Sequence, residues 1–251
     1  MVHLNGAAAP MNEITSIADD HGIPIIEDVA QAIGGSYYGR RLGSIGRLAA
    51  FSFWEDKIIT TGGEGGAVVT DDAHLAERMR RFRHHGESRP PGARVYASVE
   101  LGHNYRLTAI QAALGTSQMQ RIDGFLSARQ RNACEMSSGL STVQGIQVPF
   151  EIPRSRHAYW KYVCRIPSSN EEIIDRITVK LRERGVPAFR RYPVPLHRQP
   201  VFVQLGFGDQ PCPVSEHLAG ELFSLPVHPL INTDHISYMV ATIAGVLSEA
   251  L

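Results

Sequence analysis

Lysine is scarce in this chain. Of its 25 lysine and arginine residues only three are lysines, namely Lys57, Lys161 and Lys180. A position that needs only positive charge would usually carry arginine here, so each lysine raises the question of whether an amine is required. A guanidinium stays protonated, whereas an ammonium can be desolvated, lose its proton and attack a carbonyl. A Schiff-base lysine is therefore one interpretation of such a position.

Lys57 is the lysine whose surroundings favour that interpretation. Lys161 lies in an alternating segment and Lys180 on the polar face of an amphipathic run, so both are expected to be ordinary exposed groups. Taken alone, Lys57 would also be interpreted first as a surface lysine, because two acidic residues precede it. However, it is followed by Gly62-Gly63-Glu64-Gly65-Gly66, whose glycines permit a tight backbone that can approach a ligand closely. The neighbouring segments therefore decide between the two interpretations.

Cysteine and long apolar runs are also rare. The three cysteines, Cys134, Cys164 and Cys212, are odd in number and lack C-x-x-C spacing, which argues against a disulfide framework and a zinc site. We expect a reducing, cytoplasmic compartment and no metal. No apolar run approaches the roughly 18 residues of a membrane span, and no charged-then-apolar leader is present at the start. A formal net charge of +0 gives no reason to expect nucleic acid or a membrane as partner.

Two predicted strands end at polar residues. Ile23–Asp28 is an apolar run that ends in a carboxylate, and Leu48–Phe53 is an apolar run that ends at Ser52 and the lysine loop. In open α/β sheets, ligands bind at the carboxyl ends of the strands, so Asp28 is placed like a site residue. The alternative is that Asp28 caps the turn that follows, a role compatible with function. A helix is predicted over Pro10–His21 from its apolar spacing.

The second half of the chain predicts a smaller α+β domain. Glu87–Glu100 is rich in proline and glycine and is expected to be a loop that forms part of a substrate pocket. A long helical pattern follows, from about Leu107 to Leu140. Alternation over Tyr159–Ile166 predicts a strand, and Asn170–Arg184 predicts an amphipathic helix. We therefore expect residues 1–130 to be the remainder of a large domain and residues 131–251 to be a small C-terminal domain.

The polar residues at the strand ends have the chemistry that pyridoxal phosphate requires. Its ring nitrogen needs a carboxylate, its aldehyde an amine, and its phosphate hydroxyl and N–H donors. Together with the motifs below, the chain resembles the DegT/StrS family of pyridoxal-phosphate-dependent sugar aminotransferases, which have the aspartate aminotransferase fold. The segments that carry the resemblance run in family order: Val2–Gly6, Glu27–Gly34, Phe51–Phe53 with Lys57, Thr60–Gly66, Arg83–Gly86, Gly102–Leu107 with Ile110–Ala113, and Tyr192–His197.

The resemblance implies a role for five residues. Lys57 would bind the cofactor covalently and shuttle protons, and Asp28 would pair with the pyridinium nitrogen. Gln31 would lie against the 3-oxygen of the ring, and Ser52 would bind the phosphate. Asn104 would reach the phosphate of the neighbouring subunit's cofactor, which implies a homodimer with shared active sites.

Two more residues belong to a proline-punctuated loop. Tyr192 and His197 are candidates for substrate contact, and a packed loop without such a role is an equal alternative. His157, at the head of a strand, is expected to be structural.

The implied fold is α/β, fold type I of the pyridoxal-phosphate-dependent transferases, with a truncated large domain, a mixed sheet and a small C-terminal α+β domain. The implied function is transfer of an amino group from glutamate or glutamine to a keto-sugar in amino-sugar biosynthesis, and the resemblance implies that this sugar is nucleotide-linked. By this resemblance, family chains are longer at the front and carry further strands of the sheet there. A sheet that lacks those strands would have an unpaired edge and exposed apolar surface. The alternative is therefore an inactive fragment or subunit that needs an N-terminal part.

Overall fold

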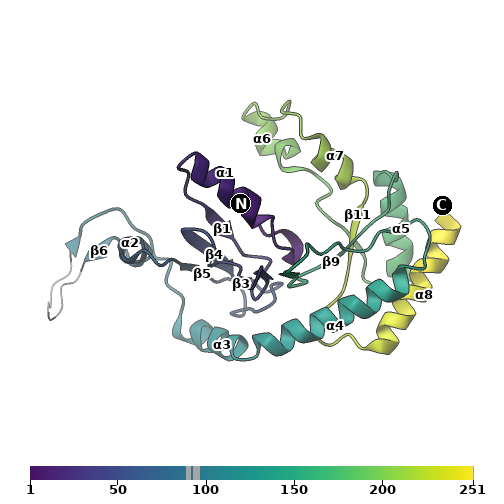
Figure 1. Cartoon of the computed structure of the whole chain (residues 1–251), viewed down its shortest axis with the longest axis horizontal. Coiled ribbons are helices and arrows are strands. Elements are labelled where there is room, and N and C mark those ends of the chain that lie inside the picture. The colour runs from purple at the N-terminus through teal and green to yellow at the C-terminus, as the bar shows by residue number, and fades with distance from the viewer. Residues whose placement is uncertain (89–91, 93–96, 251) are drawn as a thin grey trace. The chain divides into compact units, whose positions relative to one another are not determined.

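The computed structural model describes residues 1–88, 92 and 97–250, which form two compact units (Figure 1). Unit 1 consists of Met1–Leu126 and Glu151–Ala158, and unit 2 consists of Ser127–Phe150 and Tyr159–Leu251. The domain boundary expected at residue 130 stays a prediction. Half of the predicted pocket loop over Glu87–Glu100, residues 89–91 and 93–96, lies outside the described residues.

The helices and strands of unit 1 are short and numerous. In chain order they are η1 (Leu4–Gly6), α1 (Met11–Asp20), β1 (Ile26–Asp28), β2 (Ser36–Tyr37), β3 (Arg40–Arg41), β4 (Leu48–Ser52), β5 (Gly66–Val69), α2 (Ala73–Arg83), β6 (Glu87–Ser88), β7 (Ala97–Ser98), α3 (Ala109–Met119), the start of α4 (Ile122–Leu140) and β8 (Ser155–Arg156).

The main sheet of unit 1 has the order β1-β4-β5. β1 and β4 are parallel, with Asp28 opposite Ala50, whereas β5 is antiparallel to β4, with Ser52 opposite Gly66. The predicted mixed sheet is confirmed. Because β1 and β4 run in the same direction, their last residues lie at the same edge of the sheet. Two smaller sheets, β3-β2-β8 and β6-β7, complete the unit.

A small apolar core holds the β1 side of this sheet. Met11 from α1, Val29 after β1 and Ala49 from β4 are buried in one cluster with Tyr37 and Leu42. β5 lies on the other side and differs, because all four of its residues are exposed, Val68 by 49% and Val69 by 44%. Within the part of the chain that the structure describes, β5 is the last strand of this sheet and exposes apolar surface, as the sequence led us to expect.

Unit 2 is an antiparallel sheet covered by helices. It contains β9 (Tyr162–Arg165), α5 (Glu171–Glu183), β10 (Phe189–Arg190), η2 (Leu196–Arg198), α6 (Pro200–Gln204), α7 (Pro213–Ala219), β11 (Leu222–Leu225) and α8 (Thr233–Ala250), and its sheet has the order β10-β11-β9. The apolar faces of α5 and α8 pack with the sheet into one core. The Asn170 side chain caps α5 by accepting from the Ile173 N–H, and Gly185, with a φ of 75°, follows its end.

The long helix predicted over Leu107–Leu140 is wrong as a single element. The structure has two helices, α3 and α4, with a break at Gln120–Arg121. There the Arg121 N–H donates to the Gln118 carbonyl, three residues back, so the chain tightens and the α-helical ladder stops. The side chain of Thr108 begins α3 in a reciprocal capping box with Gln111.

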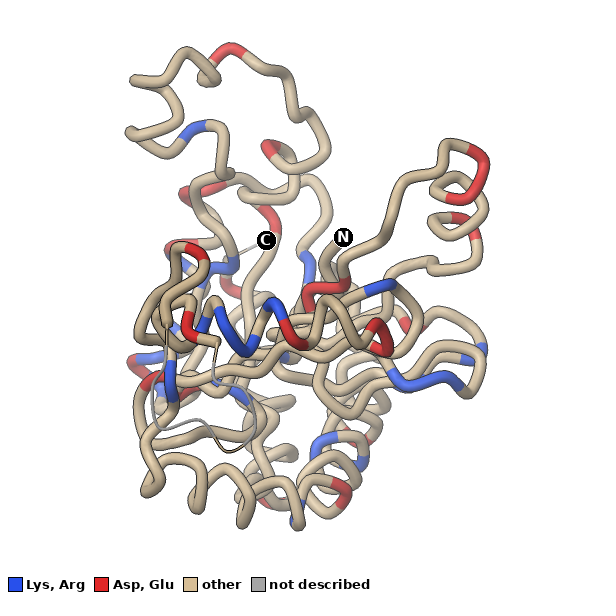
Figure 2. The backbone as a smooth tube through the Cα atoms, turned by 90° about the vertical axis from the view of Figure 1, so that its left-hand side faces the viewer, with Lys and Arg blue, Asp and Glu red and all other residues tan. Residues whose placement is uncertain are grey.

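Charge is spread evenly over the chain. Figure 2 shows acidic and basic residues interspersed along the backbone, in agreement with the formal net charge of +0. Among the described residues, no helix combines the length and the apolar character needed to cross a bilayer. Nor do three or more His, Cys, Asp or Glu side chains in the described ranges come together as metal ligands.

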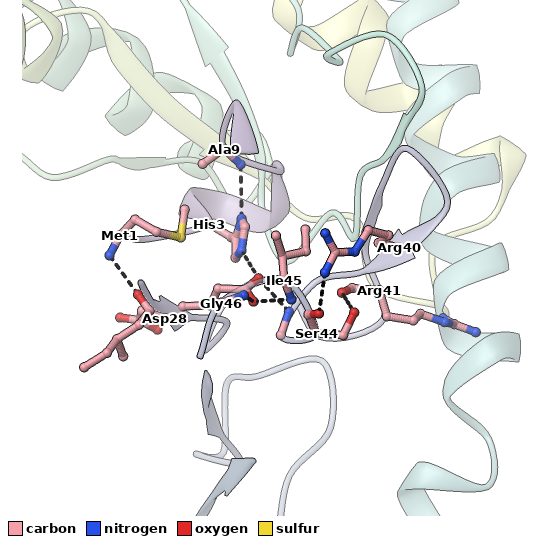
Figure 3. A network of polar contacts seen from close by, with 12 residues as sticks. Met1, His3, Ala9, Asp28, Arg40, Arg41, Ser44, Ile45 and Gly46 are labelled. Carbon is pink, nitrogen blue, oxygen red and sulfur yellow. Dashed lines mark hydrogen bonds and ion pairs between the residues drawn. The ribbon is translucent and has the colours of Figure 1, made fainter. Parts of the chain in front are cut away.

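A buried carboxylate fixes β1 to its surroundings. Glu27, in the middle of β1, is fully buried and accepts four hydrogen bonds, from the His3 ring and from three backbone N–H groups of the turn between β3 and β4. Figure 3 shows the contributions of His3, Ile45 and Gly46 to this network. Burial alone raises the pKa of the Glu27 carboxyl. The four hydrogen bonds outweigh this effect and lower the pKa to about 2 from 4.5.

This shift predicts acid sensitivity. Because the pKa is lower in the folded state, the stabilisation by Glu27 is complete above the unfolded-state value of 4.5 and is lost as the pH falls toward 2. The difference corresponds to about 3 kcal/mol. We expect the urea midpoint for unfolding of unit 1, followed through Trp54 fluorescence in a Trp160→Phe background, to fall between pH 5 and pH 3 and further toward pH 2, because the loss begins near the unfolded-state pKa of 4.5.

The matched control is Glu27→Gln in the same background, which cannot ionise. Its midpoint should be lower at pH 6 and should change less between pH 5 and pH 3. Equal pH dependence in the two proteins would show that other carboxylates cause the acid sensitivity.

Candidate functional site

Asp28 ends β1 with a fixed side chain. Its backbone N–H donates to the Met1 carbonyl at 2.8 Å, and its carbonyl accepts from the His3 N–H at 3.0 Å. The carboxylate oxygen Oδ1 accepts from the Ala30 N–H at 2.9 Å, so Asp28 also stabilises the turn after the strand. The capping role and a ligand role are compatible, because a carboxylate has two oxygens with room for several donors.

Gln31 lies on the turn that Asp28 begins. Its Oε1 accepts from the Asn5 N–H at 2.6 Å. A backbone N–H can only donate, so this contact sets the orientation of the amide: the oxygen faces Asn5 and the NH2 group faces away from it as a donor. Asn5 makes this hydrogen bond from a left-handed backbone conformation, with a φ of 57°, which asparagine tolerates better than most residues.

Ser52 and Lys57 belong to the end of β4 and the loop that follows. The Ser52 hydroxyl accepts from the Trp54 N–H at 3.3 Å, and the Lys57 N–H donates to the Trp54 carbonyl at 3.0 Å. The Lys57 ammonium lies 6.0 Å from the centre of the Trp54 ring. The loop thus turns back on itself directly after the sheet edge.

A buried threonine closes this lysine loop. The Thr61 N–H donates to the Phe53 carbonyl at 3.0 Å, and its hydroxyl donates to the Glu64 carbonyl at 3.0 Å. A Cβ on Gly65 would lie 2.2 Å from the Thr61 hydroxyl oxygen, so this position has no room for a side chain. The glycine cluster singled out in the sequence therefore lets the chain return against Thr61 and enter β5.

Asn104 is held by a different part of unit 1. It forms an antiparallel bridge with His84, after α2, and its Oδ1 accepts from Arg106 Nε at 2.9 Å. The two segments cross at Gly86 and Gly102, where a Cβ on Gly102 would lie 2.0 Å from the Gly86 nitrogen. Asn104 is exposed, and the structure places it on this crossing and not on the sheet edge of Asp28 and Ser52.

Tyr192 and His197 lie in unit 2. The Arg191 guanidinium lies 4.4 Å from the Tyr192 ring centre, and His197 Nε2 forms a hydrogen bond with Glu216 Oε1 at 2.7 Å. The hydrogen bond from His197 lowers the pKa of the Glu216 carboxyl. Tyr192 is 41% exposed, whereas the His197 side chain is 10% exposed, so of the two only His197 is packed, and contact of both residues with substrate stays a prediction.

His157 belongs to unit 1 and is buried. Burial lowers its pKa to about 4, so it is neutral at pH 7.

The chemistry of the donor set fits pyridoxal phosphate. The carboxyl ends of β1 and β4 and the segments directly after them supply a carboxylate, an amide NH2, a hydroxyl and an amine, from Asp28, Gln31, Ser52 and Lys57. The parallel pairing of the strands places the first and third of these at one sheet edge. These are the groups that a pyridinium nitrogen, a phenolic oxygen, a phosphate and an aldehyde require.

Sequence reasoning missed the residues that support this set. His3 and Glu27 are both fully buried beneath the edge, Asn5 orients Gln31, and Thr61 closes the lysine loop. One signal was present: a second carboxylate directly before Asp28 on a short apolar strand must point to the opposite face. The hydrogen bond from the Asn5 backbone N–H could not be predicted from the sequence, because nearly every residue type carries this donor.

Comparison with known proteins identifies relatives of this chain. Residues 1–244 match the family described as DegT/DnrJ/EryC1/StrS aminotransferase. The chain is 36% identical over 245 residues to a "pleiotropic regulatory protein" of Geobacillus stearothermophilus, which covers 97% of this chain and 63% of that protein. It is 34% identical over 251 residues to a dTDP-3-amino-3,4,6-trideoxy-alpha-D-glucose transaminase of Micromonospora megalomicea subsp. nigra, covering 98% and 65%.

A solved structure extends the similarity to three dimensions. S. venezuelae DesV, in complex with a ketimine intermediate, superposes with a TM-score of 0.86 at 34% identity, covering 97% of this chain and 63% of that chain. The chain thus spans slightly less than two thirds of the length of these relatives. The predicted fold type I is confirmed, and pyridoxal phosphate is the cofactor that the family indicates. The match over residues 1–244 shows that the chain belongs to the DegT/DnrJ/EryC1/StrS aminotransferase family.

Proposed function

We propose that this chain carries the catalytic lysine of a sugar aminotransferase. The reaction moves an amino group from L-glutamate or glutamine to a keto-sugar, and the product belongs to amino-sugar biosynthesis. The observation that carries the proposal is the parallel pairing of β1 and β4, which brings Asp28 and Ser52 to one edge, with Lys57 in the closed loop that follows. The Micromonospora relative, named for a dTDP-linked sugar, supports a nucleotide-linked acceptor.

Four residues would hold the cofactor. The Asp28 carboxylate would keep the ring nitrogen protonated, and the Gln31 NH2 group would donate to the ring oxygen. Ser52 would donate its hydroxyl proton to the phosphate, and Lys57 would be the covalent attachment point. Bound pyridoxal phosphate supplies an aldehyde that exchanges amines and a ring that accepts an electron pair.

Lys57 would also move the proton that the reaction requires. With the amino donor bound, the Lys57 Nζ would act as a base next to the donor carbon that carries the nitrogen. It would take the proton from that carbon in the first half of the reaction and would deliver a proton to the sugar carbon in the second half. The closed loop between Phe53 and Thr61 keeps the amine at one sheet edge for both transfers.

Asn104 supports a dimer with shared active sites. The contact from Arg106 to its Oδ1 leaves the amide nitrogen as the outward donor, suited to a phosphate oxygen. Apolar residues near it in sequence are strongly exposed, Leu101 by 93%, Tyr105 by 64% and Ile110 by 85%, which is typical of a surface that a second subunit covers. We propose that Asn104 of one subunit completes the phosphate site of the other.

The cysteines support a cytoplasmic location for this enzyme. Cys134, Cys164 and Cys212 are all free thiols, which suits a reducing compartment.

The first prediction concerns the covalent site. After incubation with pyridoxal phosphate and reduction with borohydride, peptide mapping should find the label on Lys57. Lys57→Arg should abolish the label and the transfer of nitrogen from glutamate, because arginine cannot form the bond. Lys180→Arg is the matched control and should retain both, since Lys180 pairs with Glu249 on the surface of unit 2. A label on Lys161 or Lys180 would contradict the site assignment, and a wild type without any label would favour the inactive-fragment alternative.

The second prediction concerns the shared site. Lys57→Ala and Asn104→Ala should each reduce amino transfer strongly. Mixed and allowed to exchange subunits, they should recover about a quarter of the wild-type activity, because one of the two sites in each mixed dimer has both residues intact. If Asn104 serves its own subunit, the mixture should stay as inactive as its components. Lys57→Ala mixed with Lys57→Arg is the matched control and should show no recovery.

A further inference from the structure

We infer that Glu27 and His3 form a buried brace that positions Asp28 and Gln31 without touching the ligand. The inference rests on the proposed function of Asp28 and Gln31 and deepens it. Both brace residues have no exposed surface, and their side chains meet at 3.0 Å. The side chains of His3 and Glu27 contact each other and the backbone N–H groups of Ala9, Gly43, Ile45 and Gly46. We therefore infer that they act on Asp28 and Gln31 through the backbone.

The Glu27 end of the brace acts on the strand. Side chains alternate along a strand, so Glu27 points away from the face that Asp28 uses. Its Oε2 accepts from the Gly43 N–H at 2.8 Å, and its Oε1 accepts from the Ile45 and Gly46 N–H groups at 2.7 and 2.6 Å. The carboxylate therefore anchors β1 to a turn that holds it from the opposite face.

The His3 end of the brace acts on the N-terminal segment. Its Nδ1 accepts from the Ala9 N–H at 3.1 Å, because a backbone N–H can only donate. The proton of the neutral ring is therefore on Nε2, which donates it to Glu27. The backbone of His3 meanwhile donates to the Asp28 carbonyl. One side chain thus ties both ends of the segment from residue 3 to residue 9, as Figure 3 shows for His3 and Ala9.

The tied segment contains the group that orients Gln31. Asn5 lies between His3 and Ala9 in a left-handed conformation, and its N–H meets Gln31 Oε1 at 2.6 Å. If the segment loosens, Asn5 leaves this position and the Gln31 amide loses its fixed orientation. Asp28 loses a backbone contact at the same time. The brace therefore fixes the orientation of Asp28 and Gln31. Residues that hydrogen-bond to metal ligands orient those ligands in the same way.

The experiment compares Glu27→Gln with the matched control Glu221→Gln. Glu221 is likewise fully buried and accepts from Arg165 and from the Ser168 N–H, but it lies in unit 2. Two readouts are measured: amide hydrogen exchange at Asn5 and Ala9 in protein without added cofactor, and the affinity for pyridoxal phosphate by fluorescence titration. In Glu27→Gln an N–H group of the new amide faces a backbone or ring donor, so at least one hydrogen bond of the brace is lost. We expect exchange at Asn5 and Ala9 to rise at least about tenfold and the affinity to fall about tenfold, while Glu221→Gln changes both less than about twofold.

His3→Gln gives a second, milder variant in case Glu27→Gln does not fold. It keeps a donor toward Glu27 but gives up the acceptor for Ala9, so exchange should rise at Ala9 and Asn5 and stay protected at Gly43 and Gly46. Unchanged exchange at Asn5 overturns the brace. Raised exchange with unchanged affinity overturns its positioning role. A wild type that binds no cofactor overturns the proposed function instead, and the exchange at Asn5 still decides whether the brace holds this residue.

Discussion

The parallel pairing of β1 with β4 is the constraint on which the site depends. It brings the ends of two strands, separated by more than twenty residues of chain, to one edge of a sheet. Each end then uses a short local motif to fix its polar groups: a carboxylate that accepts from the backbone two residues on, and a hydroxyl followed by a loop that closes on itself. Without the pairing, these motifs would be ordinary turns.

The pairing in turn depends on buried polar contacts. β1 has only three residues, too few to be held by apolar packing alone. The Glu27 carboxylate compensates by accepting four hydrogen bonds in a fully buried position, a case in which complete pairing makes a buried charge acceptable. The strand that carries the proposed cofactor ligand is therefore fixed by electrostatics more than by its apolar surface.

The sequence predicted the elements whose signals are local. The apolar spacing of α1, the capping and polarity of α5 and the apolar run of β4 are all readable within about fifteen residues. The chemistry of Asp28, Ser52 and Lys57 was readable because residue type and strand position point the same way. The hydrogen bonds that hold the site in place could not be predicted from the sequence. The partners of Glu27 are residues 3, 43, 45 and 46, which only the tertiary fold brings together. The break at Gln120–Arg121 was missed because neither residue is a helix breaker.

The glycine crossing near Asn104 ties this residue to the end of α2. At Gly86 and Gly102 two backbones touch without side chains between them, and the N–H groups of His103 and Tyr105 donate to the carbonyls of Phe82 and Arg83 at the end of α2. Asn104 must therefore follow any displacement of α2, a helix with no buried residue of its own. The two proposed phosphate contacts are thus held by different parts of unit 1: Ser52 belongs to the end of β4 in the main sheet, whereas Asn104 is tied to the end of α2.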